Sequence, residues 1–234
     1  MLTNAEIKRI KSLREKKFRD EYGQFVVEGE KLVEEALASN FRVSAVYRIE
    51  ETGEEAMSRM TQLSSPSPVL AVVDKPAPRG LVLERGLYLG LDSVRDPGNM
   101  GTIIRLADWF GVSTVFASPD SVEIFNPKVV QATMGSIFRV HIVYSDLVDI
   151  CRRFRAADMP VYGTFLDGES IYAQALSSEG IIIMGNEANG ISDEVGRQVS
   201  SRLLIPSFAK GRTAESLNVA AATAVCLSEF RRRG

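Results

Sequence analysis

The strongest constraint in this sequence is the regular alternation of short apolar runs with amphipathic segments over its C-terminal part. Six runs favour strands: LYLGLDSV, VSTVFAS, RVHIVY, PVYGTFL, GIIIMG and RLLIPS. Between them lie segments with helical spacing, such as GTIIRLADWFG and DLVDICRRFRAAD. Strands that alternate with helices in this way predict an α/β domain with a mostly parallel sheet.

The N-terminal part carries a separate and smaller α/β pattern. A polar helix is expected over residues 4–19 and a strand over residues 22–29, and GEKLVEEALAS then has the spacing of an amphipathic helix. Two more strands, VSAVYRI and VLAVV, flank the helical EEAMSRMTQL, and DKPAPRG has the composition of a linker. We therefore expect a small α/β domain over residues 1–75, a linker over residues 76–85 and a larger domain over residues 86–234.

Composition argues against several classes of protein. The chain has no run of about 18 apolar residues, so no membrane-spanning helix is expected, and its N-terminus lacks the apolar core of a signal peptide. Cys151 and Cys226 lie in helix-like apolar patterns without CxxC spacing, and the chain has a single histidine. Neither a disulfide framework nor a metal site is expected, and a reducing cytoplasm fits best.

The distribution of charge is more informative than the net charge of −2. Residues 1–19 hold seven bases and two acids, whereas residues 20–55 hold ten acids and three bases. A basic helix of this kind can attract a polyanion. The alternative is a solvated helix face whose bases pair with the neighbouring acids.

Three loops at expected strand ends stand out, because ligands of parallel α/β sheets bind where the strands end. In the first loop, the turn DPGN leads into a helix that holds Asn99, Gly101 and Arg105. A helix that starts with small residues can receive an anion. The glycines do not follow the GxGxxG spacing, so a dinucleotide-binding interpretation is weak. Arg105 also has a simpler interpretation, an exposed pair with Asp108.

The second loop follows the buried run GIIIMG. Gly185 ends the strand, and Asn186, Glu187 and Gly190 lie in a tight loop before the next helix. Asparagine and glycine tolerate positive φ, so the loop is explained by turn formation alone. The alternative is that Glu187, an acid directly after a buried strand, meets a ligand.

The third loop follows RLLIPS. The strand stops at Ile205 and Pro206, and the polar segment SFAKGRTAE comes next. Ser216 is expected to cap a terminal alanine-rich helix that begins near Leu217 and Asn218.

Taken together, the three loops resemble the three motifs of the SpoU (TrmH-like) RNA ribose 2′-O-methyltransferases. The first is similar to the family's Asn-x-Gly-x-x-x-Arg, the second to its Gly-x-Glu loop, and the third to its Ile-Pro strand end and Ser-Leu-Asn-Val helix start. The matching residues are Asn99, Gly101, Arg105, Gly185, Glu187, Gly190, Ile205, Pro206, Ser216, Leu217, Asn218 and Val219. The resemblance spans residues 88–230, and residues 1–75 resemble the family's small substrate-binding domain. Two features depart from the pattern: SFAKGRTAE is longer than the usual Gly/Ser-rich connection, and Asn189 replaces another small or acidic residue.

The resemblance implies a trefoil-knotted (SPOUT-type) methyltransferase domain with a mostly parallel sheet, acting on ribosomal or transfer RNA with S-adenosylmethionine as cofactor. It also implies a homodimer formed through the knotted domain. The catalytic residues it implies are Arg105, Asn99, Glu187, Ser216 and Asn218. The implied cofactor-binding residues are Gly185, Asn186, Glu187, Ile205, Pro206, Ser216 and Leu217. Lys8, Lys11, Lys16 and Lys17 in the basic helix are expected to bind RNA.

The role of Arg105 has two alternatives. The resemblance implies a general base, but a guanidinium is essentially always protonated. The other role is a clamp on a phosphate that also stabilises charge developing on the 2′-oxygen. Two rival classes are a nucleotide-dependent oxidoreductase, which the missing third glycine disfavours, and a non-catalytic RNA-binding protein.

Overall fold

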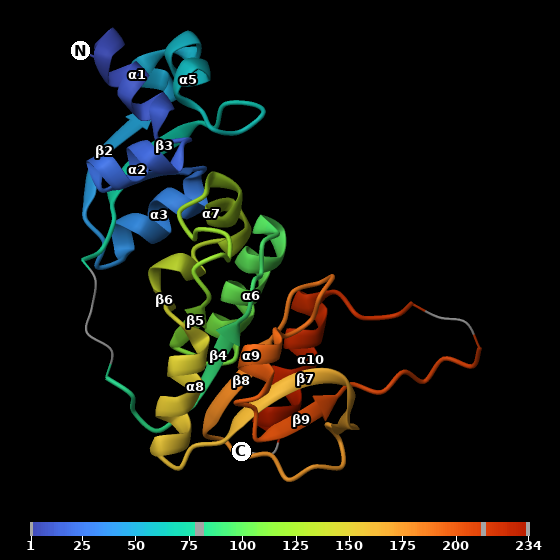
Figure 1. Ribbon diagram of the computed structural model, residues 1–234. Coiled ribbons are helices and arrows are strands. Elements are labelled where there is room, and N and C mark those ends of the chain that lie inside the picture. Colours follow the sequence, from blue (N-terminus) through green and yellow to red (C-terminus); the bar gives the residue numbers. More distant parts are fainter. Residues whose placement is uncertain (1, 78–81, 212–213, 233–234) are drawn as a thin grey trace. The chain divides into compact units, whose positions relative to one another are not determined.

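The protein folds into two compact units (Figure 1). The computed structural model describes residues 2–77, 82–211 and 214–232. The first unit comprises Met1–Leu81 and Glu123–Arg139, and the second comprises Val82–Val122 and Val140–Gly234. The segment 123–139, which lies inside the larger domain expected from the sequence, therefore groups with the N-terminal residues. Residues 78–81 of the expected linker lie outside the described residues.

The first unit is built on a three-stranded antiparallel sheet with the strand order β1-β3-β2. Its elements are α1 (Asn4–Ser12), α2 (Lys16–Tyr22), β1 (Gln24–Glu28), α3 (Glu30–Ala38), β2 (Val43–Arg48), α4 (Ile49–Thr52), α5 (Glu54–Met60), β3 (Val69–Asp74), α7 (Pro127–Thr133) and the 3₁₀ helix η1 (Ser136–Phe138). Successive side chains of a strand point to opposite faces. Val69, Ala71 and Val73 accordingly enter one core, and Leu70 and Val72 enter another.

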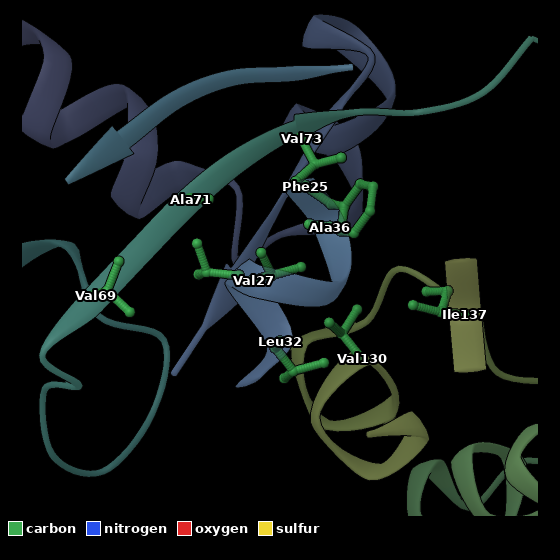
Figure 2. Close-up of a cluster of buried hydrophobic side chains, with 10 residues drawn as sticks. Phe25, Val27, Leu32, Ala36, Val69, Ala71, Val73, Val130 and Ile137 are labelled. Carbon is green, nitrogen blue, oxygen red and sulfur yellow. The ribbon is translucent and has the colours of Figure 1, made fainter. Parts of the chain in front are cut away.

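The segment 123–139 completes the core of the first unit. Val130 and Ile137 join the cluster that β1, α3 and β3 form, as Figure 2 shows. The Gln131 side chain donates to the backbone oxygen of Glu28 at 3.0 Å. Burying these side chains stabilises the unit through apolar area removed from water. The first unit is therefore assembled from two separate stretches of the chain.

The single polar helix expected over residues 4–19 is wrong: the structure has two helices, α1 and α2, separated by a break at Leu13 and Arg14. The buried Arg19 guanidinium donates to the backbone oxygens of Leu13 and Arg14 at 2.9 and 2.7 Å. It also pairs with Glu123 at 2.5 Å. Carbonyl groups at the end of a helix have no hydrogen-bond donor within the helix. The Arg19 guanidinium donates to two of these carbonyl groups and thereby stabilises the break.

The second unit contains a six-stranded sheet in which every pair is parallel, which confirms the expected α/β fold. Its elements are β4 (Leu87–Leu91), α6 (Pro97–Trp109), β5 (Thr114–Ala117), β6 (His141–Tyr144), α8 (Leu147–Ala156), β7 (Val161–Ser170), β8 (Gly180–Met184), α9 (Asp193–Gly196), β9 (Ser201–Leu204) and α10 (Val219–Arg232). None of the described helices has the length and apolar character needed to cross a membrane. Cys151 and Cys226 are buried free thiols, and burial raises the pKa of each to about 12.

The strand order β6-β5-β4-β8-β7-β9 contains a change of direction. From β4 the chain proceeds outward to β5 and β6, whereas β8 leads to β9 on the opposite side of the sheet. The connections that leave β4 and β8 therefore diverge, although the two strands are neighbours. In open parallel sheets a crevice forms at such a point, outside the carboxyl ends of the strands. The topology alone therefore predicts a ligand site at the loops that follow β4 and β8.

Candidate active site

The loops after β4 and β8 start side by side. Leu91 pairs with Met184 at the carboxyl ends of the two strands, and the Asp92 backbone N–H donates to the Met184 oxygen at 2.9 Å. The first loop leads into α6, whose N-cap is Asp96: its carboxylate accepts from the Asn99 backbone N–H at 2.8 Å. The helix start that holds Asn99 is thereby fixed next to the loop after β8.

Three predicted site residues from three different loops form one chain of hydrogen bonds. The Asn99 Nδ2 donates to the Glu187 Oε1 at 2.6 Å. The Asn218 Nδ2 donates to the Asn99 Oδ1 at 2.9 Å. These residues lie 88 and 119 positions apart in the sequence, so the fold brings the three loops to one place.

The cap of the last helix is Asn218, and the expectation that Ser216 caps it is wrong. The helix α10 begins at Val219, and the Asn218 Oδ1 accepts from the backbone N–H groups of Ala220 and Ala221 at 3.0 and 3.2 Å. Asparagine is as effective an N-cap as serine. Ser216 lies two residues before the cap and is exposed.

The cap determines the direction of the hydrogen-bond chain. Because the Asn218 Oδ1 is occupied by two backbone donors, its Nδ2 must face Asn99. The Asn99 side chain must then present its Oδ1 to Asn218 and its Nδ2 to Glu187. An amide has one accepting and one donating end, so each orientation follows from the one before it. The position of the Glu187 carboxylate is thus linked to the start of α10.

The loop after β8 has little freedom. Asn186 and Gly190 exchange two backbone hydrogen bonds of 2.9 Å, and the Asn186 Nδ2 donates to the Ser93 backbone oxygen at 2.7 Å. A Cβ at Gly185 would lie 2.2 Å from the Gly190 carbonyl carbon. Only glycine fits at Gly185, because the backbone of the loop passes directly over it. Glu187 is therefore presented from a rigid turn.

Sequence reasoning missed Asp92, which ties the two loops together. The Asp92 carboxylate is buried and accepts from both the backbone N–H and the hydroxyl of Ser192, each at 2.7 Å. The Asp92 carboxylate thus provides the acceptor for the Ser192 backbone N–H, where the loop after β8 turns toward α9. The available signal was an acid directly after the apolar run LYLGL.

Ser93 and its neighbours, also missed, fix the loop after β4. Ser93 has a φ of 61°, a conformation uncommon for residues other than glycine. Its backbone N–H donates to the Ser118 Oγ at 2.8 Å, and its hydroxyl donates to Asp120 at 2.5 Å. Hydrogen bonds from Ser118, Ser93 and Arg95 hold the pKa of Asp120 well below its ordinary value. Asp120 thus stays ionised and anchors the loop.

Arg105 lies on α6, six residues beyond Asn99, and its side chain is exposed. It makes no hydrogen bond or ion pair with any residue that the structure describes, so the alternative pair with Asp108 does not form. The structure also does not connect Arg105 to the chain of Asn99, Glu187 and Asn218 by a hydrogen bond. Its guanidinium is available to an anionic ligand.

Three backbone positions near the ends of β8 and β9 and before α10 make no hydrogen bond with the residues that the structure describes. Within the described residues, Gly185, Ile205 and Leu217 make no backbone hydrogen bond. No described residue bonds to these backbone groups, so they are open to a ligand. The Leu217 side chain is 54% exposed and offers an apolar surface. The arrangement fits a ligand with hydrogen-bonding edges and a flat apolar part.

The four lysines expected to bind RNA lie in the first unit and are all exposed. Lys8 and Lys11 are on α1 and make no hydrogen bond or ion pair among the described residues. Lys16 pairs with Asp20 at 2.6 Å, and Lys17 lies over the Phe18 ring. The hydrogen bonds from Lys16 and Lys75 lower the pKa of Asp20 to about 2. Part of the basic surface is therefore neutralised within the unit.

Family models match both parts of the chain. The model of the SpoU rRNA Methylase family matches residues 86–228, and the model of the MRM3-like substrate binding domain matches residues 4–76. The chain belongs to the SpoU rRNA methylase family. The N-terminal match agrees with the resemblance of residues 1–75 to a substrate-binding domain.

Individual relatives of the SpoU family agree with this assignment. The chain is 33% identical over 97% of its length to the 23S rRNA (guanosine(2553)-2′-O)-methyltransferase RlmP of Bacillus subtilis, of which it covers 96%. A TrmH-family structure from Porphyromonas gingivalis is 40% identical with a TM-score of 0.88, and each chain covers the other fully. An AdoMet-bound rRNA methyltransferase from Sinorhizobium meliloti is 33% identical with a TM-score of 0.88, covering 100% of this chain and 96% of that one.

As a SpoU family member, the protein is an S-adenosylmethionine-dependent RNA ribose 2′-O-methyltransferase. This assignment removes the support for the two rival classes, the oxidoreductase and the non-catalytic RNA-binding protein. The unpaired backbone groups at Gly185, Ile205 and Leu217 fit the cofactor, because an adenine offers hydrogen-bonding edges and an apolar face.

Proposed function

We propose that the enzyme methylates a ribose 2′-hydroxyl in ribosomal RNA, and in particular in RNA of the large subunit. The observation that carries this proposal is the similarity to RlmP over nearly the whole of both chains, including the N-terminal part. A shared substrate-binding unit supports a shared class of substrate more strongly than a shared catalytic unit does. The relatives from bacteria also support a place in the cytoplasm, where ribosomal RNA is made.

The test is tritiated methyl transfer to ribosomal RNA and to transfer RNA from cells that lack the gene. We expect label in the 23S RNA, and nuclease digestion should release it as a 2′-O-methylnucleoside. Label in transfer RNA alone would contradict the proposed substrate, and label on a base would contradict the position of the methyl group.

The proposed cofactor site consists of the residues around the free backbone groups: Gly185, Asn186, Glu187, Ile205, Pro206, Ser216 and Leu217. When bound, S-adenosylmethionine supplies a methyl group on a sulfonium, which needs alignment with the nucleophile more than it needs protein chemistry. Asn186 acts through the loop, because both ends of its amide are used within the protein. Ser216 and Leu217 are held next to this site by the capping of α10.

Two of the proposed catalytic residues, Arg105 and Ser216, touch the RNA, and the others shape the pocket or hold its side chains in place. Arg105 has a free guanidinium, which grips the phosphate beside the target ribose and stabilises charge on the 2′-oxygen. Asn99 and Glu187 shape the pocket. Asn218 orients them from the start of α10, and Ser216 orients the hydroxyl. The guanidinium stays protonated throughout, so Arg105 is a clamp in this proposal rather than a base.

Replacing Lys8, Lys11, Lys16 and Lys17 together by alanine should weaken RNA binding and flatten its salt dependence. Each lost phosphate contact reduces the magnitude of the slope of log K against log salt by about 0.7 to 0.9, so the loss of four contacts should reduce it by about 2.8 to 3.6. Cofactor affinity should not change. The measurement is a salt titration of RNA binding, with Lys31→Ala on α3 as control. An unchanged slope would mean that the lysines are only a solvated face.

The proposal includes a homodimer formed through the second unit. It also includes a trefoil knot in that unit, as the family resemblance implies. Trp109, at the end of α6, is 86% exposed, and it lies one turn beyond Arg105 on the same helix face. Large aromatic side chains are enriched in the cores of interfaces. Two copies that meet along this face would bring the partner chain next to Arg105.

Trp109→Glu should convert the dimer into a monomer, because a carboxylate at the centre of an apolar interface loses its hydration without gaining a partner. Sedimentation velocity measures the change, and unfolding by heat shows whether the fold is intact. Leu37→Glu, at a 55% exposed position on α3, is the matched control. A dimer that persists in Trp109→Glu would place the interface elsewhere.

A further inference from the structure

The segment between β9 and α10 carries an aromatic side chain that the protein itself does not use. Phe208 is 81% exposed. It takes part in none of the ring contacts among the described residues, and the described parts of this segment extend away from the sheet (Figure 1). Exposing a phenylalanine in this way forgoes the apolar burial that such a side chain normally provides. This is the part of the chain that is longer than the usual connection in the family.

The neighbouring charge favours an anionic partner. Lys210 is exposed, two residues beyond Phe208, and makes no ion pair with any described residue. Gly211 has a φ of 98° and open space around it, so the backbone turns there without packing against the protein. A ring and a free ammonium on one extended loop match the two features of a nucleotide, a flat base and a phosphate.

Both ends of the loop are attached at the candidate active site. It leaves the sheet at Ile205 and Pro206, and it returns at Asn218, which donates to Asn99. Two extended residues span about 7 Å, so Phe208 lies within about 7 Å of the Pro206 end of the site. Stacked nucleotides follow one another at about 3.4 Å along a strand. The ring is therefore within reach of a nucleotide one or two steps from the target.

We propose that Phe208 stacks on an unpaired base of the substrate RNA that flanks the methylated nucleotide, while Lys210 contacts the adjoining phosphate. The loop Ser207–Gly211 thus selects RNA that presents an unstacked base next to the target ribose. Stacking of splayed bases on aromatic rings is a general mode of recognising single-stranded RNA. This inference rests on the RNA methyltransferase function, and it adds a specificity-determining residue to it.

Steady-state methylation of unmethylated 23S RNA tests the stacking. Phe208→Ala should raise KM for RNA about 10-fold, with the Kd for S-adenosylmethionine and the melting temperature unchanged. Phe208→Tyr should stay within about 2-fold of wild type, because it keeps the ring, whereas Phe208→Leu should behave like alanine. Val82→Ala, at another strongly exposed apolar position, is the control. Lys210→Gln should lower the salt slope by about 0.7.

Four outcomes would overturn the inference. A KM that stays normal in Phe208→Ala means that the ring does not contact RNA. A leucine variant as good as wild type means apolar contact without stacking. A weakened Kd for S-adenosylmethionine would make the loop a cover for the cofactor, and a loss of the dimer would make it an interface. Wild type is assayed on the same RNA. If the proposed substrate is wrong, wild type itself will not methylate this RNA, and that result is distinct from a failure of the stacking proposal.

Discussion

Arg105→Ala should lower kcat/KM for RNA methylation about 100- to 1,000-fold, the range seen when a group that stabilises developing oxyanion charge is removed. The fold and the Kd for S-adenosylmethionine should stay near wild type. The guanidinium is exposed and bonded to no described residue, so its loss removes no contact that stabilises the protein. The cofactor is proposed to be held by backbone groups of other loops. Methyl incorporation and calorimetry of cofactor binding measure the two effects.

Arg105→Lys distinguishes a planar clamp from a simple positive charge. A lysine keeps the charge but cannot give two parallel hydrogen bonds to a phosphate, so we expect it to fail substantially as well. Arg153→Ala is the matched control, since Arg153 is an exposed arginine on α8 of the same unit. Near-normal methylation by Arg105→Ala would remove Arg105 from the mechanism and leave it as a surface residue.

Asn218→Asp should lower kcat/KM about 10- to 100-fold with little change in melting temperature. Aspartate caps a helix as well as asparagine does, so the start of α10 is preserved. The new carboxylate cannot donate to the Asn99 Oδ1. Asn99 must then turn its amide nitrogen toward that carboxylate, which leaves its oxygen facing the carboxylate of Glu187. The repulsion between these two oxygens displaces Glu187.

A second substitution should repair this defect. Glu187→Gln in the Asn218→Asp background gives position 187 an amide that can donate to the turned Asn99 oxygen. The double variant should therefore bind S-adenosylmethionine and methylate RNA better than Asn218→Asp alone, although Glu187→Gln by itself gains nothing. Asn218→Ala, which loses the cap as well, should lose about 1 kcal/mol of stability. Additive effects of the two substitutions would show that the cap does not control the orientation of Glu187.

The periodicity of the sequence was sufficient for the second unit, because burial on both faces of a parallel sheet leaves a clear alternation of apolar runs and helices. It was not sufficient for residues 4–19. The break between α1 and α2 depends on carbonyl contacts from Arg19 and on Glu123, which lies 104 positions further along the chain. The grouping of residues 123–139 with the first unit likewise depends on contacts with distant strands.

The residues of the candidate site were likewise predicted only in part from the sequence. Motif resemblance indicated Asn99, Glu187 and Asn218, and the structure joins them. Resemblance did not reveal that Asn218, rather than Ser216, is the cap, because both residue types cap helices equally well and only the register of α10 decides. Asp92 was missed for a related reason. Its partner Ser192 is 100 positions away and meets it only through the pairing of β4 with β8.

The central claim is that S-adenosylmethionine binds at the carboxyl ends of β4, β8 and β9, on backbone groups that the protein leaves free. Hydrogen exchange of backbone amides, with and without the cofactor, tests this most directly. We expect new protection at Gly185, Ile205 and Leu217, because their N–H groups have no partner among the described residues, and no protection from NAD. Protection by S-adenosylmethionine confined to other segments, or the same protection by NAD alone, would contradict the account.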